Sequence, residues 1–132
     1  MKNTIALTLV LLLCLSIFSA CKKDDITINN GEESDIVGIW KPDQIEEMGT
    51  TYTINEYESL YNFDFNVTYE FMSDGVVVCT NSGFTYDGTY KVNDHNVEIT
   101  SAGITQTWFL NGGKLIIPSP GSEEARMICV KK

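Results

Sequence analysis

The feature that most constrains the fold is a two-residue alternation of apolar and polar side chains that begins near Ile36 and continues to the end of the chain. In residues 67–71, valine, tyrosine and phenylalanine alternate with threonine and glutamate, and residues 86–92 repeat the pattern. A period of two residues is typical of half-buried β-strands. Strands with one wet face belong to antiparallel sheets, so the sequence predicts an all-β fold.

Eight segments carry this pattern, at residues 36–47, 67–72, 76–81, 86–92, 96–100, 105–110, 114–118 and 126–131. Pro42 requires an edge position or a kink in the first of them. Residues 73–75, 93–95 and 111–113 have the composition of tight turns, whereas the other connections, 48–66, 82–85, 101–104 and 119–125, look longer. We therefore expect an antiparallel up-and-down eight-stranded barrel with tight turns at a closed end and longer loops around an open end. Eight strands enclose room for packed side chains or for one small ligand.

The N-terminal segment has the layout of a secretory signal peptide, predicted at residues 1–20. Its apolar run, Ile5–Phe18, is 14 residues long, and a membrane-spanning helix needs about 20. A short positive start, a short apolar centre and small residues before a break are typical of a signal peptide.

The residues Phe18-Ser19-Ala20-Cys21 resemble the bacterial lipobox, with phenylalanine where leucine is usual. The resemblance implies a diacylglycerol and palmitate anchor on Cys21; the alternative is a plain signal peptide followed by a chance cysteine. Residues 21–35 are polar and acidic and are predicted to form a flexible tether. The sequence "KKDD" resembles signals that send lipoproteins of the Bacteroidota to the outer face of the outer membrane, so we expect lipid anchoring there; the periplasmic or cell-surface side stays open.

Net charge excludes two classes of partner. The chain has 9 Lys and Arg, 18 Asp and Glu and a formal net charge of −9, and removal of Lys2 with the leader makes the mature chain more acidic still. Nucleic-acid binding requires a basic footprint. Binding along an anionic membrane surface through protein side chains also requires basic residues. Membrane attachment is therefore expected only through the lipid.

The segments Gly38-Ile39-Trp40, "YEFMSDGVVV" and "GTYKVNDHNVEIT" resemble the lipocalin-like domains of Bacteroidota lipoproteins, and the resemblance covers residues 36–132. It implies a calycin-like barrel in which Gly38 and Trp40 are structural and Trp40 closes one end. It also implies a basic side chain over Trp40, for which Lys131 and Lys132 are the candidates.

Two sets of side chains are candidates for ligand binding. The first lies in the connection 48–66, where aromatic residues would form a lid over an apolar ligand or would only cap the core, with a short helix at 56–61. The second lies inside the barrel and would orient a ligand or would only pack. The candidates are Tyr52, Tyr57, Tyr61, Phe63 and Phe65 in the lid, and Tyr69, Tyr90, Gln106 and Trp108 inside.

Catalytic and metal-binding motifs are not found. The single histidine, His95, falls in a tight turn at the expected closed end, so it completes neither a catalytic triad nor a His-based metal site. No glycine-rich phosphate loop precedes a helix, and no cofactor is predicted. Cys79 and Cys129 lie on strands three steps apart, which favours two unbridged thiols over a disulfide.

The sequence thus supports two hypotheses, neither of them enzymatic. The first is a membrane-anchored lipoprotein that binds a small apolar or amphipathic ligand in the barrel. The alternative is a filled barrel that acts as a protein-interaction or inhibitor module at the cell envelope. A ligand-binding barrel should contain a cavity of about 300 Å³ or more, so the cavity volume separates the two.

Overall fold

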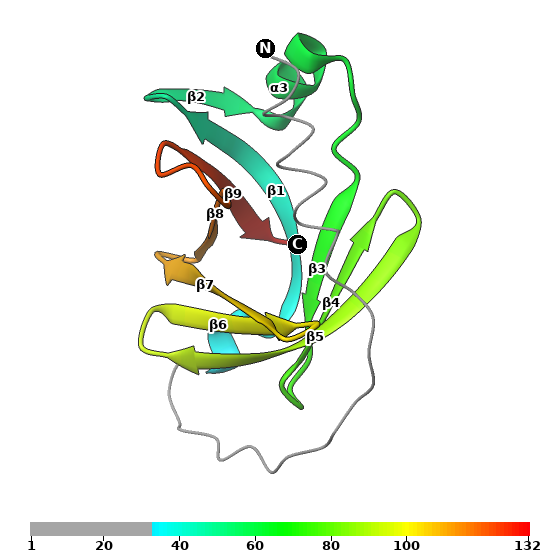
Figure 1. Cartoon of the computed structure of the whole chain (residues 1–132), viewed down its shortest axis with the longest axis vertical. Helices are drawn as coiled ribbons and strands as arrows, with labels where there is room; N and C mark the ends of the chain where they lie inside the picture. The colour runs from blue at the N-terminus through cyan, green and yellow to red at the C-terminus, as the bar shows by residue number, and fades with distance from the viewer. Residues whose placement is uncertain (1–32) are drawn as a thin grey trace.

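The structure, a computed structural model, describes residues 33–132. The predicted signal peptide, Cys21 and residues 22–32 of the tether lie outside the described residues. Residues 33–132 form one antiparallel sheet that closes on itself as a β-barrel, consistent with a lipocalin-like fold (Figure 1). The predicted all-β barrel is confirmed.

The strands follow one another around the barrel in chain order, and β1 pairs with β9 to close it. The elements are α2 (Glu33–Ile36), β1 (Gly38–Glu47), β2 (Thr50–Thr53), α3 (Ile54–Tyr61), β3 (Val67–Phe71), β4 (Val76–Asn81), β5 (Phe84–Asn93), β6 (Asn96–Ser101), β7 (Ile104–Asn111), β8 (Lys114–Pro118) and β9 (Ala125–Lys131). All eight predicted strands are present, with ends that differ by at most two residues. In β1, the register with β9 shifts between Pro42 and Gln44, a bulge where the sequence predicts a kink.

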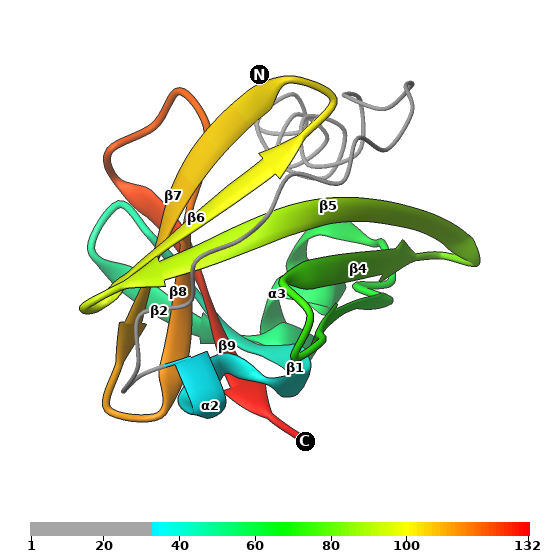
Figure 2. The same ribbon diagram turned by 90° about the horizontal axis from the view of Figure 1, so that it is seen from below.

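The barrel has two distinct ends, as the alternation of connections requires. At the closed end lie α2 and the turns at 72–75, 94–95 and 112–113; at the open end lie the turns at 48–49, 82–83 and 102–103, the loop 119–124 and α3. Figure 2 shows the molecule from below, with α2 and the C-terminus near each other.

Two connections at the open end are shorter than the sequence suggested. The links β4–β5 and β6–β7 are two-residue turns, Ser82-Gly83 and Ala102-Gly103, and not the longer loops expected at 82–85 and 101–104. Both residues of each turn have positive φ, between 48° and 87°. This is the geometry of type I′ hairpins, whose twist matches that of the strands they join. The expected ring of long loops around the open end is therefore wrong at these two positions.

The connection 48–66 contains more secondary structure than a loop with a short helix. Met48 and Gly49 form another tight turn, and β2 pairs with residues 44–47 of β1 as a ninth strand. Helix α3 follows directly. Its N-cap, Thr53, accepts a hydrogen bond from the Glu56 N–H, and the Glu56 carboxylate accepts one from the Thr53 N–H. This capping box explains why the helix begins at Ile54 and not at the predicted Glu56.

The closed end is built around Trp40, which is buried. Its indole Nε1 donates a hydrogen bond to the Ile36 carbonyl in α2 over 2.7 Å. The Lys131 Nζ lies 5.4 Å from the centre of the indole ring, so Lys131 is the lysine that covers it. Gly38 begins β1 at φ +133°, a value that side-chain-bearing residues rarely adopt, beside the aliphatic part of Lys131. Because α2 covers this end, the last residues assigned to the tether are part of the folded unit.

Candidate functional site

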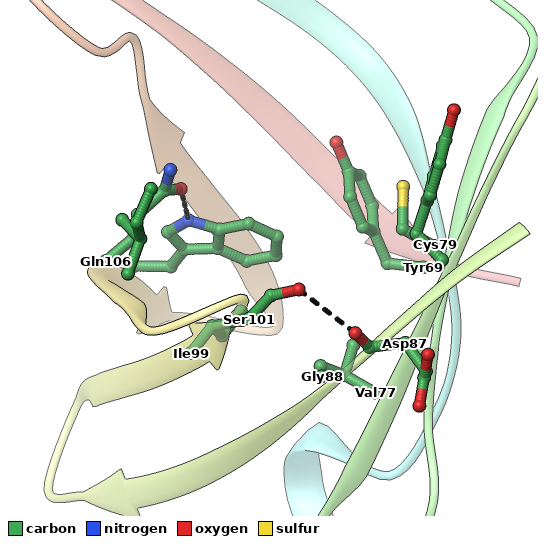
Figure 3. A pocket seen from close by; sticks show the side chains of 11 residues that line it. Tyr69, Val77, Cys79, Asp87, Gly88, Ile99, Ser101 and Gln106 are labelled. Atoms are coloured by element: carbon green, nitrogen blue, oxygen red, sulfur yellow. Dashed lines mark hydrogen bonds between the residues drawn. The ribbon is translucent and has the colours of Figure 1, made fainter. Parts of the chain in front are cut away.

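The candidate site is a cavity inside the barrel, between β3, β4 and β5 on one side and β6 and β7 on the other (Figure 3). Four of its lining residues, Tyr69, Val77, Ile99 and Trp108, are buried. The remaining lining residues are Cys79, Tyr86, Asp87, Gly88, Ser101, Ile104 and Gln106. Three of the four interior residues that sequence analysis singled out, Tyr69, Gln106 and Trp108, are therefore brought together here.

Polar and aromatic contacts fix the cavity walls. The Trp108 indole donates to the Gln106 side-chain oxygen over 3.2 Å, so the amide oxygen is held by a neighbour within the site. The Tyr69 and Trp108 rings meet edge to face with centres 5.1 Å apart. Such a pair stabilises the core by about 0.5–1.5 kcal/mol beyond the area it buries. The Trp108 ring thus contacts both other interior candidates, Gln106 through its indole N–H and Tyr69 through its ring.

The cavity ends where β5 and β6 come together. The Ser101 hydroxyl donates to the Asp87 carbonyl over 3.0 Å, as Figure 3 shows. Gly88 lies beside this bond, and a Cβ built on Gly88 would be 2.8 Å from the Thr100 carbonyl oxygen. The absence of a side chain at Gly88 lets the two strands approach this closely.

The cavity is small, at about 70 Å³. Sites for drug-sized ligands have volumes of about 300–1,000 Å³, and a water molecule in the liquid occupies about 30 Å³. The space therefore accommodates a small chemical group or one amino-acid side chain. The rest of the interior is filled by Phe71, Tyr90, Leu115 and their buried neighbours.

The aromatic residues of the connection 48–66 form a separate cluster and do not line the cavity. Tyr57 on α3 is at its centre, 2% exposed, and the Tyr52, Tyr61, Phe63 and Phe65 rings lie around it with centres 4.5–6.4 Å away. All five pack against the barrel core. Their contacts with one another and with the core are those of packing, and their role in ligand binding stays a prediction.

Burial changes the acidity of this cluster. Loss of hydration raises the pKa of Tyr57 well above its ordinary value, and the nearby Glu47 carboxylate raises it further. The pKa of Tyr61 is raised mainly by burial and also by Glu47, whose carboxylate accepts a hydrogen bond from the Tyr61 hydroxyl over 3.1 Å. Both phenols are therefore neutral donors at physiological pH.

Two other predicted residues lie away from the cavity. The Tyr90 hydroxyl donates to the Met72 carbonyl over 2.7 Å, which places the ring near the closed end. His95 is in the turn between β5 and β6, on the closed-end surface near Trp40 and Lys131.

The two described cysteines form no disulfide with each other, as the sequence favoured. Cys79 lines the cavity and Cys129 is fully buried. Burial raises the pKa of the Cys129 thiol far above its ordinary value, and Asp43 and Cys79 raise it further. Cys129 is therefore a protonated core residue.

Charge is strongly asymmetric along the barrel. Of the cationic side chains in residues 33–132, only Arg126 is at the open end, where it pairs with Glu46. The open end also carries Glu47, Glu56, Glu58, Asp64, Asp87, Glu123 and Glu124. The lysines Lys41, Lys91, Lys114, Lys131 and Lys132 lie in the rest of the barrel together with Asp35, Asp43, Glu70, Asp74, Asp94 and Glu98, so only the open end has a large excess of negative charge. The sequence contains all of these charged residues, but only the fold shows at which end of the barrel each one lies.

Within residues 33–132, no three His, Cys, Asp or Glu side chains are grouped as metal ligands. No helix in the same range is long and apolar enough to cross a membrane.

The closed sheet and its packed interior define the class: an antiparallel up-and-down β-barrel protein whose fold is consistent with a lipocalin-like architecture. Comparisons of the chain with protein-family models, with curated proteins and with solved structures found no match.

Proposed function

We propose that this chain is a non-enzymatic, lipid-anchored lipoprotein whose filled barrel presents an acidic open end to a basic protein partner. The carrying observation is the uneven distribution of charge: the open end has eight carboxylates and one arginine, whereas five lysines offset most of the six carboxylates in the rest of the barrel. A surface of one sign raises the rate of association with a partner of the opposite sign.

The cavity volume favours this function over the binding of a small apolar or amphipathic ligand. A space of about 70 Å³ is several times smaller than the about 300 Å³ at which ligand sites begin. The aromatic cluster around Tyr57 is already packed, so it supplies no further volume as it stands.

The lipid anchor is proposed on the sequence alone, from the lipobox-like residues Phe18-Ser19-Ala20-Cys21. The proposed location is the outer membrane of a Gram-negative bacterium, with attachment through Cys21; it is supported by the sequence "KKDD", which resembles the signals of Bacteroidota lipoproteins. The described chain begins at α2, beside Trp40, so residue 33 lies at the closed end of the barrel.

The charge proposal is tested with two variants of equal net charge. All described strands and the core cluster lie within residues 33–132, so a soluble protein beginning at Lys22 retains them. In this protein, Glu123→Gln with Glu124→Gln removes two open-end charges. The control, Glu70→Gln with Asp94→Asn, removes two exposed charges elsewhere.

The probe is a hexalysine peptide, with binding followed by calorimetry at about 20 mM and about 150 mM salt. We expect the open-end variant to bind at least about threefold more weakly than the control variant, with the difference shrinking at the higher salt. Equal binding by both variants would show that only net charge matters and would contradict the assignment of the open end. Crosslinking on intact cells then identifies the natural partner.

A further inference from the structure

One strand at the open end has an incomplete set of neighbours. β5 pairs with β4 from Phe84 to Thr89, but its pairing with β6 begins only at Thr89. Along Phe84–Asp87, β5 therefore has no strand on its other side among residues 33–132. Figure 2 shows the cause: the β4–β5 and β6–β7 hairpins point in different directions beyond the region where β5 and β6 pair.

The backbone groups that face this gap are identified by two hydrogen bonds. The Tyr90 N–H donates to the Gly75 carbonyl, on the side of β5 that faces β4. The Asp87 carbonyl accepts from Ser101, on the side that faces β6. Because alternate residues of an antiparallel strand direct both their N–H and C=O to the same side, the N–H and C=O of Thr85 and the N–H of Asp87 face the gap.

The cavity lies directly behind this edge. Tyr86 and Gly88 line it from β5, and Ile104 and Gln106 line it from β7. The two hairpin tips carry exposed apolar side chains, Phe84 at 66% and Ile104 at 51% exposed. A strand laid against the β5 edge would direct every second side chain toward this cavity and the others toward solvent.

We propose that the β5 edge at Phe84–Asp87 accepts an extended, basic peptide segment of the partner as an added strand, with one apolar side chain in the cavity. Main-chain hydrogen bonds give affinity in this mode of recognition, and a pocket for alternate side chains gives specificity. The volume of about 70 Å³ suits one aliphatic side chain. Asp87, on the edge itself, matches a basic side chain on the segment. The inference rests on the proposed function, because it names the element of the open end that the partner contacts.

The test uses a synthetic nonapeptide in which lysine and valine alternate, together with the same peptide N-methylated on every backbone nitrogen. The two peptides have equal charge and composition, but the second cannot form a ladder of main-chain hydrogen bonds. The protein begins at Lys22. Its variants are Thr85→Pro and, as a matched control, Thr85→Val, which keeps the backbone N–H. Proline is tolerated at an edge position whose N–H faces away from the neighbouring strand.

We expect the unmethylated peptide to bind wild type and Thr85→Val within about twofold of each other, and Thr85→Pro at least tenfold more weakly, equivalent to about 1.4 kcal/mol. The methylated peptide should bind wild type at least tenfold more weakly as well. Hydrogen exchange at the amides of residues 85 and 87 should slow when wild type or Thr85→Val binds the unmethylated peptide, and exchange at Asp87 should not slow in Thr85→Pro.

Equal binding of the two peptides to wild type would overturn the edge inference whatever the state of the proline variant. That result would leave the proposed function intact if the Glu123/Glu124 variant still weakened binding. If the Glu123/Glu124 variant bound as strongly as its control while the two peptides still bound wild type differently, the proposed function would be contradicted and the edge inference would stand.

Discussion

Substitution of Gly88 gives the sharpest test of how closely β5 and β6 approach beside the cavity. A Cβ at this position would lie 2.8 Å from the Thr100 carbonyl oxygen and 3.2 Å from the Ser101 Cβ. Its backbone is not in the left-handed region, so alanine meets a steric penalty without a conformational one. The first contact is with backbone, which has to move if a methyl group is added.

The magnitude follows from two opposing contributions. Overpacking of a tightly packed position destabilises by about 1–3 kcal/mol. Replacement of glycine by alanine offsets about 0.4–1 kcal/mol of this by restricting the unfolded chain. We therefore expect Gly88→Ala to lower the free energy of unfolding by about 1–2 kcal/mol, and Tm by about 5–10 °C for a domain of this size.

The assay is urea denaturation of the protein that begins at Lys22, with asparagine placed at Gly88 and at Gly49 for comparison. Gly49 has φ +78° and open space around it, and asparagine tolerates positive φ. Gly49→Asn should therefore change stability little, whereas Gly88→Asn should destabilise more than Gly88→Ala. Equal or higher stability of Gly88→Ala would refute the close approach of the two strands at this point.

Further predictions concern four other residues. Trp40→Phe removes the hydrogen bond to the Ile36 carbonyl and weakens the contact with Lys131. It should therefore lower the free energy of unfolding by about 2 kcal/mol, seen as a lower urea midpoint. Thr53→Ala breaks the capping box and should cost about 1 kcal/mol, seen as faster amide exchange in α3. Tyr57 has a pKa raised from the ordinary value of 10.0. The contribution of this tyrosine to the free energy of unfolding is fully present below pH 10 and should decline as the pH rises further, because the unfolded state then loses the phenol proton first. Cys21→Ser should move the protein from membranes to the soluble fraction, and retention of an uncleaved, membrane-bound form would contradict the proposed anchor.

The sequence was sufficient for the fold because the barrel strands are half-buried, and each one therefore carries the alternation in its own residues. It was insufficient for β2, since Thr50–Thr53 is short and no side chain of this strand is fully buried. Alanine is not an expected residue at positive φ, so the composition at Ala102-Gly103 did not predict a two-residue turn.

The candidate site was predictable only in part. Alternation places Tyr69, Gln106 and Trp108 in the interior, and the structure shows them around one cavity. The volume of that cavity depends on how the Trp108 and Tyr69 rings pack against each other, which a strand pattern does not encode. The unpaired edge of β5 depends on where two hairpins diverge, and this is a property of sheet twist and not of any residue in the edge.

The separation of charge along the barrel gives the molecule a permanent electric dipole. The end where the described chain enters the barrel is the less negative one, because five lysines offset most of the carboxylates there, and the open end is the more negative one. Near an anionic membrane, such a dipole experiences a torque that turns the lysine-bearing end toward the lipid head groups and the acidic open end away from them. For a barrel attached from the closed-end side, the tether and the electric field would both hold the closed end toward the membrane, so the open end would face the aqueous solution. Fluorescence quenching from an anionic bilayer should then be stronger for a dye on the β7–β8 turn than for one on the β6–β7 turn.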